Sequence, residues 1–335
     1  MRTYWQIAAG EWGRYYHKEF LKFGMAFVGG ETQIATMENV RQGDIVVLKR
    51  GTKEILAVAK VIQKDGKHRG CGDKEWLRDF DGWDLKAYCY VDCKQPVQPV
   101  RTTGLTRATI QKIHKQKHKD VADKILNTGI DVAVTSEPEK TRPIEDTEIL
   151  KFLVKEGLRP SSADDLTNTI SRIRLLADYY YNFPDWREIR EHETRTFLVV
   201  PLLLALGWSE QQIKIELPCS RRKRIDIACF RKSYSHERIK DDCVAIIETK
   251  GFSSGLDYGQ EQAKSYSKDF PNCKVIIVTN GYCYKIYLRV SKRQFEKEPS
   301  AYINLLKPKY RYPIDPENVG GALDAIKWLL PNNLI

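Results

Sequence analysis

The chain has 335 residues, and its 55 Lys and Arg against 44 Asp and Glu give a formal net charge of +11. This length exceeds what one core usually supports, which predicts two domains. The longest apolar run, Phe197 to Leu206, is far shorter than the roughly 20 residues that span a bilayer, and the N-terminus lacks the apolar core of a signal peptide. We therefore expect a cytoplasmic protein with no membrane partner, and the positive charge favours nucleic acid as the partner.

Residues 1–100 consist of short strand-like runs separated by turn residues. The runs read YWQIAA, MAFVGG, GDIVVLKRG, KEILAVAKVIQ and LKAYCYVDC. Aromatic residues are frequent in and around them. The pattern predicts that this first domain is a small β-barrel.

Residues 101–160 are predicted to be a helical connector and linker. The stretch TRATIQKIHKQKHKDVADKIL places apolar residues on one helical face, and residues 101–124 hold seven Lys or Arg and two Asp. Two interpretations of these charges stay open: a solvated helix face, or a connector that contacts DNA. His114 and His118 have no carboxylate partner or HExxH pattern, so we expect both at the surface. Residues 130–160 are polar and contain three prolines, which is typical of a linker.

Residues 161–335 show the pattern of a mixed α/β domain. An amphipathic helix is predicted in SSADDLTNTISRIRLLADYYYNF, where Ser and Asp provide capping signals. The elements predicted after it are helix 191–206, strands 213–217, 225–230 and 243–249, helix 258–268, and strands 274–279 and 283–288. The whole chain is therefore predicted to be α+β, with an α/β core flanked by helices in this second domain.

Three polar residues stand in or after apolar strands of this domain. Asp226 lies in RIDIACF, and the later strand VAIIETK ends in Glu248 and Lys250. Strand residues separated by one other point to the same face, so Glu248 and Lys250 can reach one site, and a neighbouring strand would add Asp226. Two carboxylates suit Mg²⁺, which offsets transition-state charge in phosphodiester hydrolysis, while a lysine orients water or stabilises charge. Taken singly, each residue has the simpler interpretation of a solvated strand end.

The stretch from Glu191 to Tyr287 resembles the nuclease domain at the N-terminus of type I restriction motor subunits, within the PD-(D/E)XK superfamily. The resemblance runs, in the family's order, through EHETRTFLVVPLLLALGW, RIDIACF, AIIETKG, QAKSYSKDF and VIIVTNGYCYKIY. It implies catalytic roles for three residues in these segments, which are Asp226, Glu248 and Lys250.

The same resemblance implies further site residues on two helices. A glutamate early in the first helix assists metal binding in the family, and Glu191 matches it, with Glu193 as the nearby alternative. The implied metal ligands are therefore Asp226, Glu248 and Glu191. A Gln-xxx-Tyr element carries over to Gln262 and Tyr266, which lie one helical turn apart and would line the site. The alternatives are an exposed helix start for the glutamates and ordinary helix packing for the glutamine and tyrosine.

The chain departs from the family pattern in two ways. The family aspartate often follows a proline, whereas Ile225 precedes Asp226 here. No GxxxxGK[ST] phosphate-binding motif occurs in the sequence, so we expect the ATP-driven translocase of type I enzymes to be absent from this polypeptide.

Residues 1–95 resemble the PUA-like group that includes EVE, YTH and related readers of modified bases. The resembling pieces are YWQI, GDIV, the strand Ala57–Val61 and DGWDL. Members of the group hold a flipped base between aromatic faces, which implies base-binding roles for aromatic residues of this domain. These residues are Trp5, Trp12, Trp76, Trp83 and Tyr15. Each tryptophan has the alternative role of a core residue, above all Trp5, which lies in an alternating strand.

Together these features predict a restriction-type endonuclease with domains at 1–100 and 161–335 and a connector at 101–160. A PUA-like reader of modified DNA bases would direct a Mg²⁺-dependent PD-(D/E)XK nuclease, in which Mn²⁺ is an expected substitute. Because such nucleases commonly pair to cut both strands, we expect a homodimer. Two alternatives stay open: a ribonuclease in RNA processing or defence, and a non-catalytic protein that only binds nucleic acid.

Overall fold

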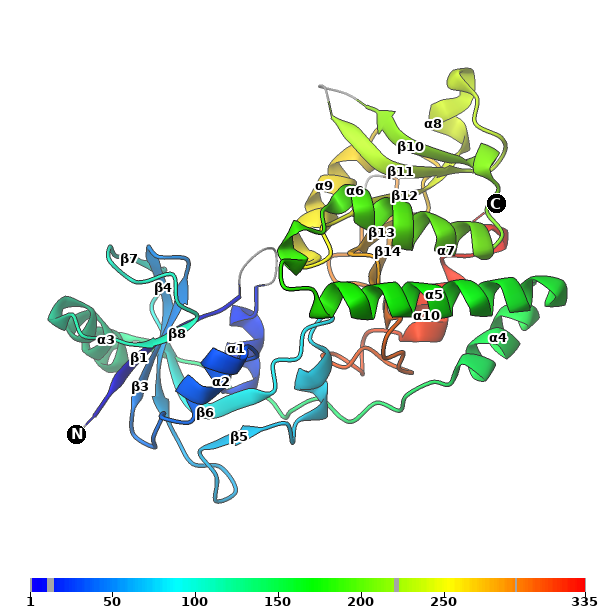
Figure 1. The fold of residues 1–335 in the computed structure, drawn as a ribbon. Coiled ribbons are helices and arrows are strands. Elements are labelled where there is room, and N and C mark those ends of the chain that lie inside the picture. The colour runs from blue at the N-terminus through cyan, green and yellow to red at the C-terminus, as the bar shows by residue number, and fades with distance from the viewer. Residues whose placement is uncertain (1, 11–14, 220–222, 293, 335) are drawn as a thin grey trace. The chain divides into compact units, whose positions relative to one another are not determined.

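The computed structural model describes the chain except for residues 1, 11–14, 220–222, 293 and 335. It divides the chain into two compact units, Met1–Pro138 and Glu139–Ile335, which are described separately below (Figure 1). The boundary falls inside the segment 101–160 that we expected to be a separate connector. Residues 101–138 belong to the first unit because their strands pair with its sheet.

A nine-stranded mixed sheet is the frame of the first unit. Its strands are β1 (Tyr4–Ala8), β2 (Met25–Val28), β3 (Ile45–Arg50), β4 (Glu54–Val61), β5 (Arg69–Cys71), β6 (Ala87–Gln95), β7 (Val100–Arg101), β8 (Ile110–Lys112) and β9 (Ile130–Asp131). The strand order is β2-β6-β4-β3-β1-β8, with β5 and β9 paired to β6 and β7 paired to β4. Only the β1–β3 pair is parallel among these described strands. The strand-rich character of this half is confirmed, and its closure into a PUA-like barrel stays a prediction.

The basic segment that we expected to be one helix is a strand followed by a helix. Strand β8 pairs antiparallel with β1, and helix α3 begins only at Gln116 and ends at Thr128. Ile110 is buried in β8. Its β-branched side chain suits a pleated strand better than the start of a helix. The surface prediction for His118 was also wrong. Its side chain is buried in the first turn of α3, and Nε2 lies 3.1 Å from the carbonyl oxygen of Thr103.

Aromatic side chains fill the core of the first unit between its short helices and the sheet. The helices are α1 (His17–Phe23) and α2 (Glu31–Met37). The ring of Phe27 lies 4.2 Å from Phe20, 5.8 Å from Trp76 and 5.3 Å from Phe80, measured between centroids. Such tilted and edge-on ring pairs stabilise a core beyond the area they bury.

The second unit is built on a seven-stranded mixed sheet. Its strands are β10 (Ile213–Pro218), β11 (Arg224–Phe230), β12 (Cys243–Thr249), β13 (Val275–Thr279), β14 (Cys283–Ser291), β15 (Gln294–Phe295) and β16 (Ala301–Asn304). The order is β10-β11-β12-β13-β14-β15, with β16 paired to β14. Strands β12 and β13 are parallel, so the chain crosses over between them through helix α9 (Asp257–Ser267), which packs on both. The predicted order of helices and strands from 191 to 288 is confirmed, as is the mixed α+β class.

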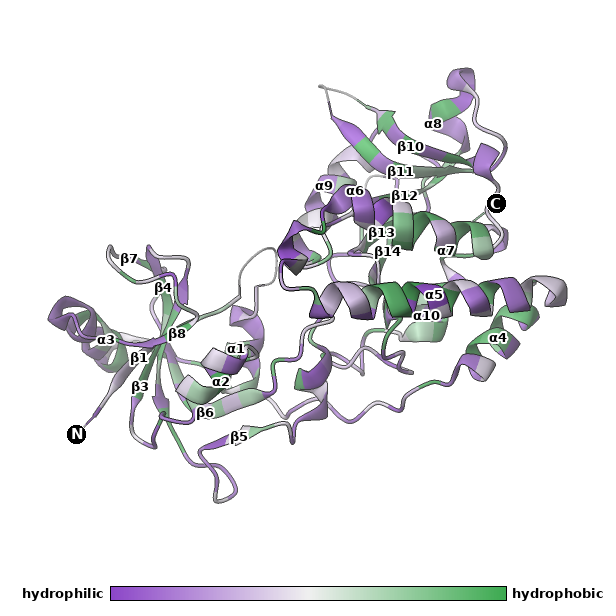
Figure 2. Cartoon of the chain, viewed as in Figure 1, coloured by the Kyte–Doolittle hydropathy of each residue, from purple (hydrophilic) through white to green (hydrophobic). Residues whose placement is uncertain are grey.

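Helices cover the sheet of the second unit (Figure 1). They are α4 (Asp146–Lys155), α5 (Ala163–Asn182), α6 (Glu191–Thr194), α7 (Val200–Ala205), α8 (Ile239–Asp242) and α10 (Ala322–Lys327), and a π-helical turn, Arg195–Val199, joins α6 to α7. Figure 2 shows hydrophobic and hydrophilic residues alternating along α5 and a largely hydrophobic α7. Strands β12 and β13 are buried at every residue, as expected for central strands with both faces covered. No helix in the described part of the chain is long and apolar enough to cross a membrane.

Candidate active site

Three acidic residues lie in one row across neighbouring strands of the second unit. The register pairs Ile227 with Ile247, so Asp226 of β11 and Glu248 of β12 occupy the next position along the two strands. On the other side, Glu216 lies between the β10 residues that pair with Ile227 and Ile225, which places it opposite Asp226. The backbone of Glu216 is left-handed, with φ of 51°, a conformation that costs free energy for a residue other than glycine.

The carboxylate of Asp226 is held from two sides. Its Oδ2 accepts hydrogen bonds from the backbone N and the hydroxyl of Thr249, at 2.8 and 2.9 Å. Its Oδ1 accepts a hydrogen bond of 2.9 Å from Nη1 of Arg195. The second guanidinium nitrogen of Arg195 donates to Glu216, also at 2.9 Å. These charge-assisted bonds fix the orientation of the Asp226 carboxylate.

Glu248 is a buried carboxylate paired with a lysine. Its side chain is 1% exposed, and its Oε1 accepts a 2.7 Å hydrogen bond from Nζ of Lys250. Burial raises the pKa of Glu248 to about 7; the Lys250 ammonium opposes this rise, and the negative charges of Asp226 and Glu191 add to it. Burial alone would lower the pKa of Lys250, but the surrounding carboxylates outweigh it, and the net pKa lies above the ordinary 10.5. Lys250 is therefore an ammonium ion at neutral pH.

A chain of polar contacts extends from Lys250 to helix α9. Its Nζ lies 3.6 Å from Oε1 of Glu191, at the start of α6, and donates to Oε1 of Gln262 at 3.4 Å. The amide nitrogen of Gln262 donates in turn to the hydroxyl of Tyr266 at 2.8 Å. The structure thus brings Glu191, Gln262 and Tyr266 into one cluster with the strand residues.

Glu193 does not join this cluster in the contacts of the described residues. Its carboxylate accepts a hydrogen bond of 3.1 Å from the backbone N of Arg190. It therefore acts as the capping side chain of α6. Of the two alternatives for the early-helix glutamate, Glu191 is the one beside Lys250.

The carboxylates at this site can accommodate a divalent metal ion. The second oxygen of Glu248, Oε2, is buried and has no hydrogen-bond partner among the described residues, so it is available to a metal ion or a proton. No group of three or more His, Cys, Asp or Glu side chains in the described residues is close enough to chelate a metal by itself. Mg²⁺ is commonly bound through one or two carboxylates and completed by substrate phosphates and water, and Asp226 and Glu248 are the residues that could hold it in this way.

The sequence prediction missed Arg195 and Glu216. Arg195 lies four residues after Glu191 and so on the same helical face, two residues before the apolar run that begins at Phe197. Its side chain is only 6% exposed. A buried arginine requires carboxylate partners, and that requirement was the available signal. No comparable signal marked Glu216, since its role depends on the register of β10 against β11.

The aromatic residues proposed for base binding divide into two groups. Trp5 and Trp76 are buried, at 2% and 6% exposure, and their indole N–H groups donate to Asp44 at 2.9 Å and to Glu137 at 3.4 Å. Both are core residues that present no open face to a base, which corrects the expectation for them. Trp83 and Tyr15 are partly exposed. Trp12 lies outside the described residues.

Part of the second unit is similar to a region of a restriction enzyme. Residues 190–300, about a third of the chain, match the family model of the type I restriction enzyme R protein N terminus. The match spans all of the polar residues described above for this unit, and it supports the resemblance found in the sequence for this region. It does not reach the first unit, for which the PUA-like resemblance stays a prediction. Among curated proteins, no match to the chain is found.

Proposed function

We propose that the second unit is an endonuclease that hydrolyses phosphodiester bonds of DNA with Mg²⁺, by PD-(D/E)XK chemistry. The observation that carries this proposal is the buried Glu248 carboxylate, with one oxygen on Lys250 and the other without a described partner, on the strand next to Asp226. A carboxylate that only supported the fold would be expected to have both oxygens satisfied.

Each polar residue has a distinct role in this proposal. Asp226 and Glu248 would hold the metal ion, which supplies Lewis-acid stabilisation of charge on the phosphate. Lys250 is protonated, so its positive charge can stabilise negative charge on the scissile phosphate, or it can donate a hydrogen bond to water. It does not serve as a general base. Thr249 and Arg195 keep the Asp226 carboxylate oriented. Gln262 limits the positions that the Lys250 ammonium can take.

The test is cleavage of unmodified, cytosine-modified and adenine-methylated duplex DNA in Mg²⁺. We expect Glu248→Gln and Lys250→Met to abolish cutting. Glu261→Gln and Lys268→Met are the matched controls, because both residues are exposed and lie in or just after α9. Cutting by wild type that survives either active-site substitution would reject this active site.

We also propose that the first unit directs cleavage to modified bases. Support comes from the partly exposed Trp83, whose ring lies 6.4 Å from that of Tyr16. Tyr15, which precedes Tyr16 in the sequence, is also partly exposed. Aromatic faces of this kind can stack on an extruded base. Trp83→Ala should then remove the preference for one modified duplex while leaving residual cutting of the others. Equal cutting of every duplex by wild type would overturn this part of the proposal.

Two further features are proposed from the nuclease chemistry. Mn²⁺ should substitute for Mg²⁺, since both prefer oxygen ligands. A homodimer would cut both strands in one encounter. Sedimentation with and without DNA measures whether the chain forms a dimer. Single-stranded RNA belongs in the same cleavage assay, because cutting of RNA and of no DNA would reassign the enzyme as a ribonuclease.

A further inference from the structure

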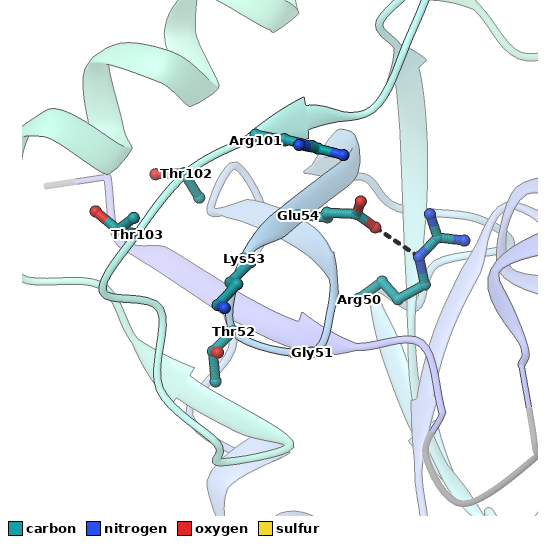
Figure 3. Close-up of a pocket in the computed structure, with 8 residues that line it drawn as sticks. All are labelled: Arg50, Gly51, Thr52, Lys53, Glu54, Arg101, Thr102 and Thr103. Atoms are coloured by element: carbon teal, nitrogen blue, oxygen red, sulfur yellow. Dashed lines mark hydrogen bonds and ion pairs between the residues drawn. The ribbon is translucent and has the colours of Figure 1, made fainter.

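A pocket of about 730 Å³ lies in the first unit at the turn between β3 and β4. Figure 3 shows its lining, in which the turn faces the segment that carries β7. The lining residues are Arg50, Gly51, Thr52, Lys53, Glu54, Arg101, Thr102 and Thr103. None of these eight residues was singled out as a site residue by the sequence, and none lies in the unit that carries the candidate active site.

The two walls of this pocket are tied together by the backbone. The N–H of Thr102 donates to the carbonyl of Lys53 at 2.8 Å, and the strand register places Glu54 opposite Arg101. Gly51 has a φ of 58°, which favours glycine at this turn. The buried Lys49 extends its Nζ to within 3.2 Å of the carbonyl oxygen of Gly51 and so braces the turn from inside. The pocket is therefore a fixed feature of the fold.

Positive charge dominates the pocket. Arg50, Lys53 and Arg101 are exposed, and the single lining carboxylate, Glu54, accepts a 2.7 Å bond from Nε of Arg50. Three threonine hydroxyls complete the lining. Three exposed cations with threonine hydroxyls, and only one carboxylate among the lining residues, suit an anion such as a phosphate group.

The start of helix α3 extends this positive region. Nζ of Lys117 lies 3.4 Å from the hydroxyl of Thr103, and Nζ of Lys115 lies 3.5 Å from the carbonyl oxygen of Gly104. Both lysines are exposed. The buried ring of His118 lies against the carbonyl of Thr103 and fixes the helix next to the pocket wall. The basic segment is thus attached to the pocket, which favours the second of its two interpretations, contact with DNA.

We propose that this pocket binds phosphate groups of the DNA backbone and gives the first unit affinity for DNA that does not depend on sequence. The choice of DNA rests on the proposed nuclease function, whereas the anion chemistry rests on the pocket alone. Backbone contacts of this kind set the position of a protein on its substrate and carry no base information. The site is therefore separate in role from both the aromatic residues and the active site.

The test is binding of a fluorescent, unmodified duplex to the full chain in EDTA, which prevents cleavage. The triple variant Arg50→Gln, Lys53→Gln, Arg101→Gln removes the three lining cations. Each phosphate contact contributes about 0.9 to the slope of log affinity against log salt, so the slope should fall by about 2 to 3. The control variant Lys18→Gln, Arg41→Gln, Lys67→Gln removes equal charge from exposed residues elsewhere in the first unit. The control variant should change the slope by less than about 0.9, which is the contribution of one phosphate contact.

A variant that is expected to strengthen binding distinguishes a loss of the binding site from a loss of folding. Glu54→Gln removes the lining carboxylate and releases Arg50, so it should tighten binding and steepen the salt slope by up to about 0.9. Inorganic phosphate should compete weakly, and duplex RNA tested in parallel should bind less tightly if DNA is the ligand. Equal losses in the triple and control variants, or no effect of Glu54→Gln, would overturn the proposal. Because binding is measured without metal, a failure of cleavage would reject the nuclease and leave this result standing.

Discussion

Arg195 and Asp226 form a bond of 2.9 Å between a guanidinium that is almost fully buried and a carboxylate at the centre of the candidate site. The same guanidinium reaches Glu216, so one cation joins acids from two adjacent strands. Since Thr249 holds the other oxygen of Asp226, both oxygens are positioned before any metal or substrate arrives. Arg195 and Thr249 therefore preorganise the Asp226 carboxylate.

Arg195 should accordingly stabilise the fold through Asp226. We expect Arg195→Gln to lower the free energy of unfolding by about 1.5–3 kcal/mol, since it removes charge-assisted bonds to Asp226 and Glu216. Urea denaturation of Arg195→Gln, Asp226→Asn and the double variant measures the coupling. The double variant should lose less than the two single variants together. Strict additivity would show that the pair contributes nothing as a pair.

Glu248 should make stability depend on pH in the metal-free protein. Its pKa rises from the ordinary 4.5 to about 7 on folding, so the folded state takes up the proton more readily than the unfolded state. The stabilisation is fully present below pH 4.5 and is lost as the pH rises through 7, for a total of about 3 kcal/mol. Glu248→Gln has no such group, so its stability relative to wild type should grow between pH 5 and 8, with Glu261→Gln as the control. A constant difference across this range would contradict the raised pKa.

The strands and the central site residues could be predicted from the sequence because their signals are local. The apolar run that ends in Glu248 and Lys250 is continuous, and its buried strand β12 ends one residue before that lysine. The segment around Ile110 shows the limit of such signals. Its apolar spacing fits a helix, but its pairing partner is β1, more than a hundred residues earlier, and tertiary pairing overrides a local pattern.

The contacts that orient the site depend on register and burial, which one sequence does not reveal. Glu216 reaches Arg195 only because β10 pairs with β11 in one register and because its backbone is left-handed. Trp5 is of a residue type that can stack on a base. Its strand nevertheless places it in the core, where its indole N–H donates a hydrogen bond to Asp44. Residue type therefore indicated which polar side chains cluster in the second unit better than it indicated which aromatic side chains are exposed in the first.

Added Mg²⁺ should stabilise the wild-type protein. A metal that binds only the folded state at about 100 times its Kd adds about 2.7 kcal/mol, so the Tm should rise with Mg²⁺ concentration. Glu248→Gln and Asp226→Asn should lose most of this rise, and Glu261→Gln should keep it. Because protons compete with the metal for Glu248, the rise should be larger above pH 7 than at pH 6. Differential scanning calorimetry with and without EDTA is the measurement, and an equal rise in all four proteins would mean that Mg²⁺ binds elsewhere.

Gly259 brings helix α9 close to Glu248 and Lys250 of the candidate site, and a larger residue at this position should disturb them. A methyl group at this position would overlap Cγ1 of Val278 and lie 3.3 Å from both Cγ of Glu248 and Cε of Lys250. Gly→Ala in a helix usually stabilises by about 0.5–1 kcal/mol, but here overpacking should reverse the sign and cost about 1–3 kcal/mol. Cleavage should fall as well, because the two side chains must shift. The exposed Ser265→Ala on the same helix should change neither property, and adding Val278→Ala should recover part of the stability; a stable, fully active Gly259→Ala protein would show that α9 does not constrain the site.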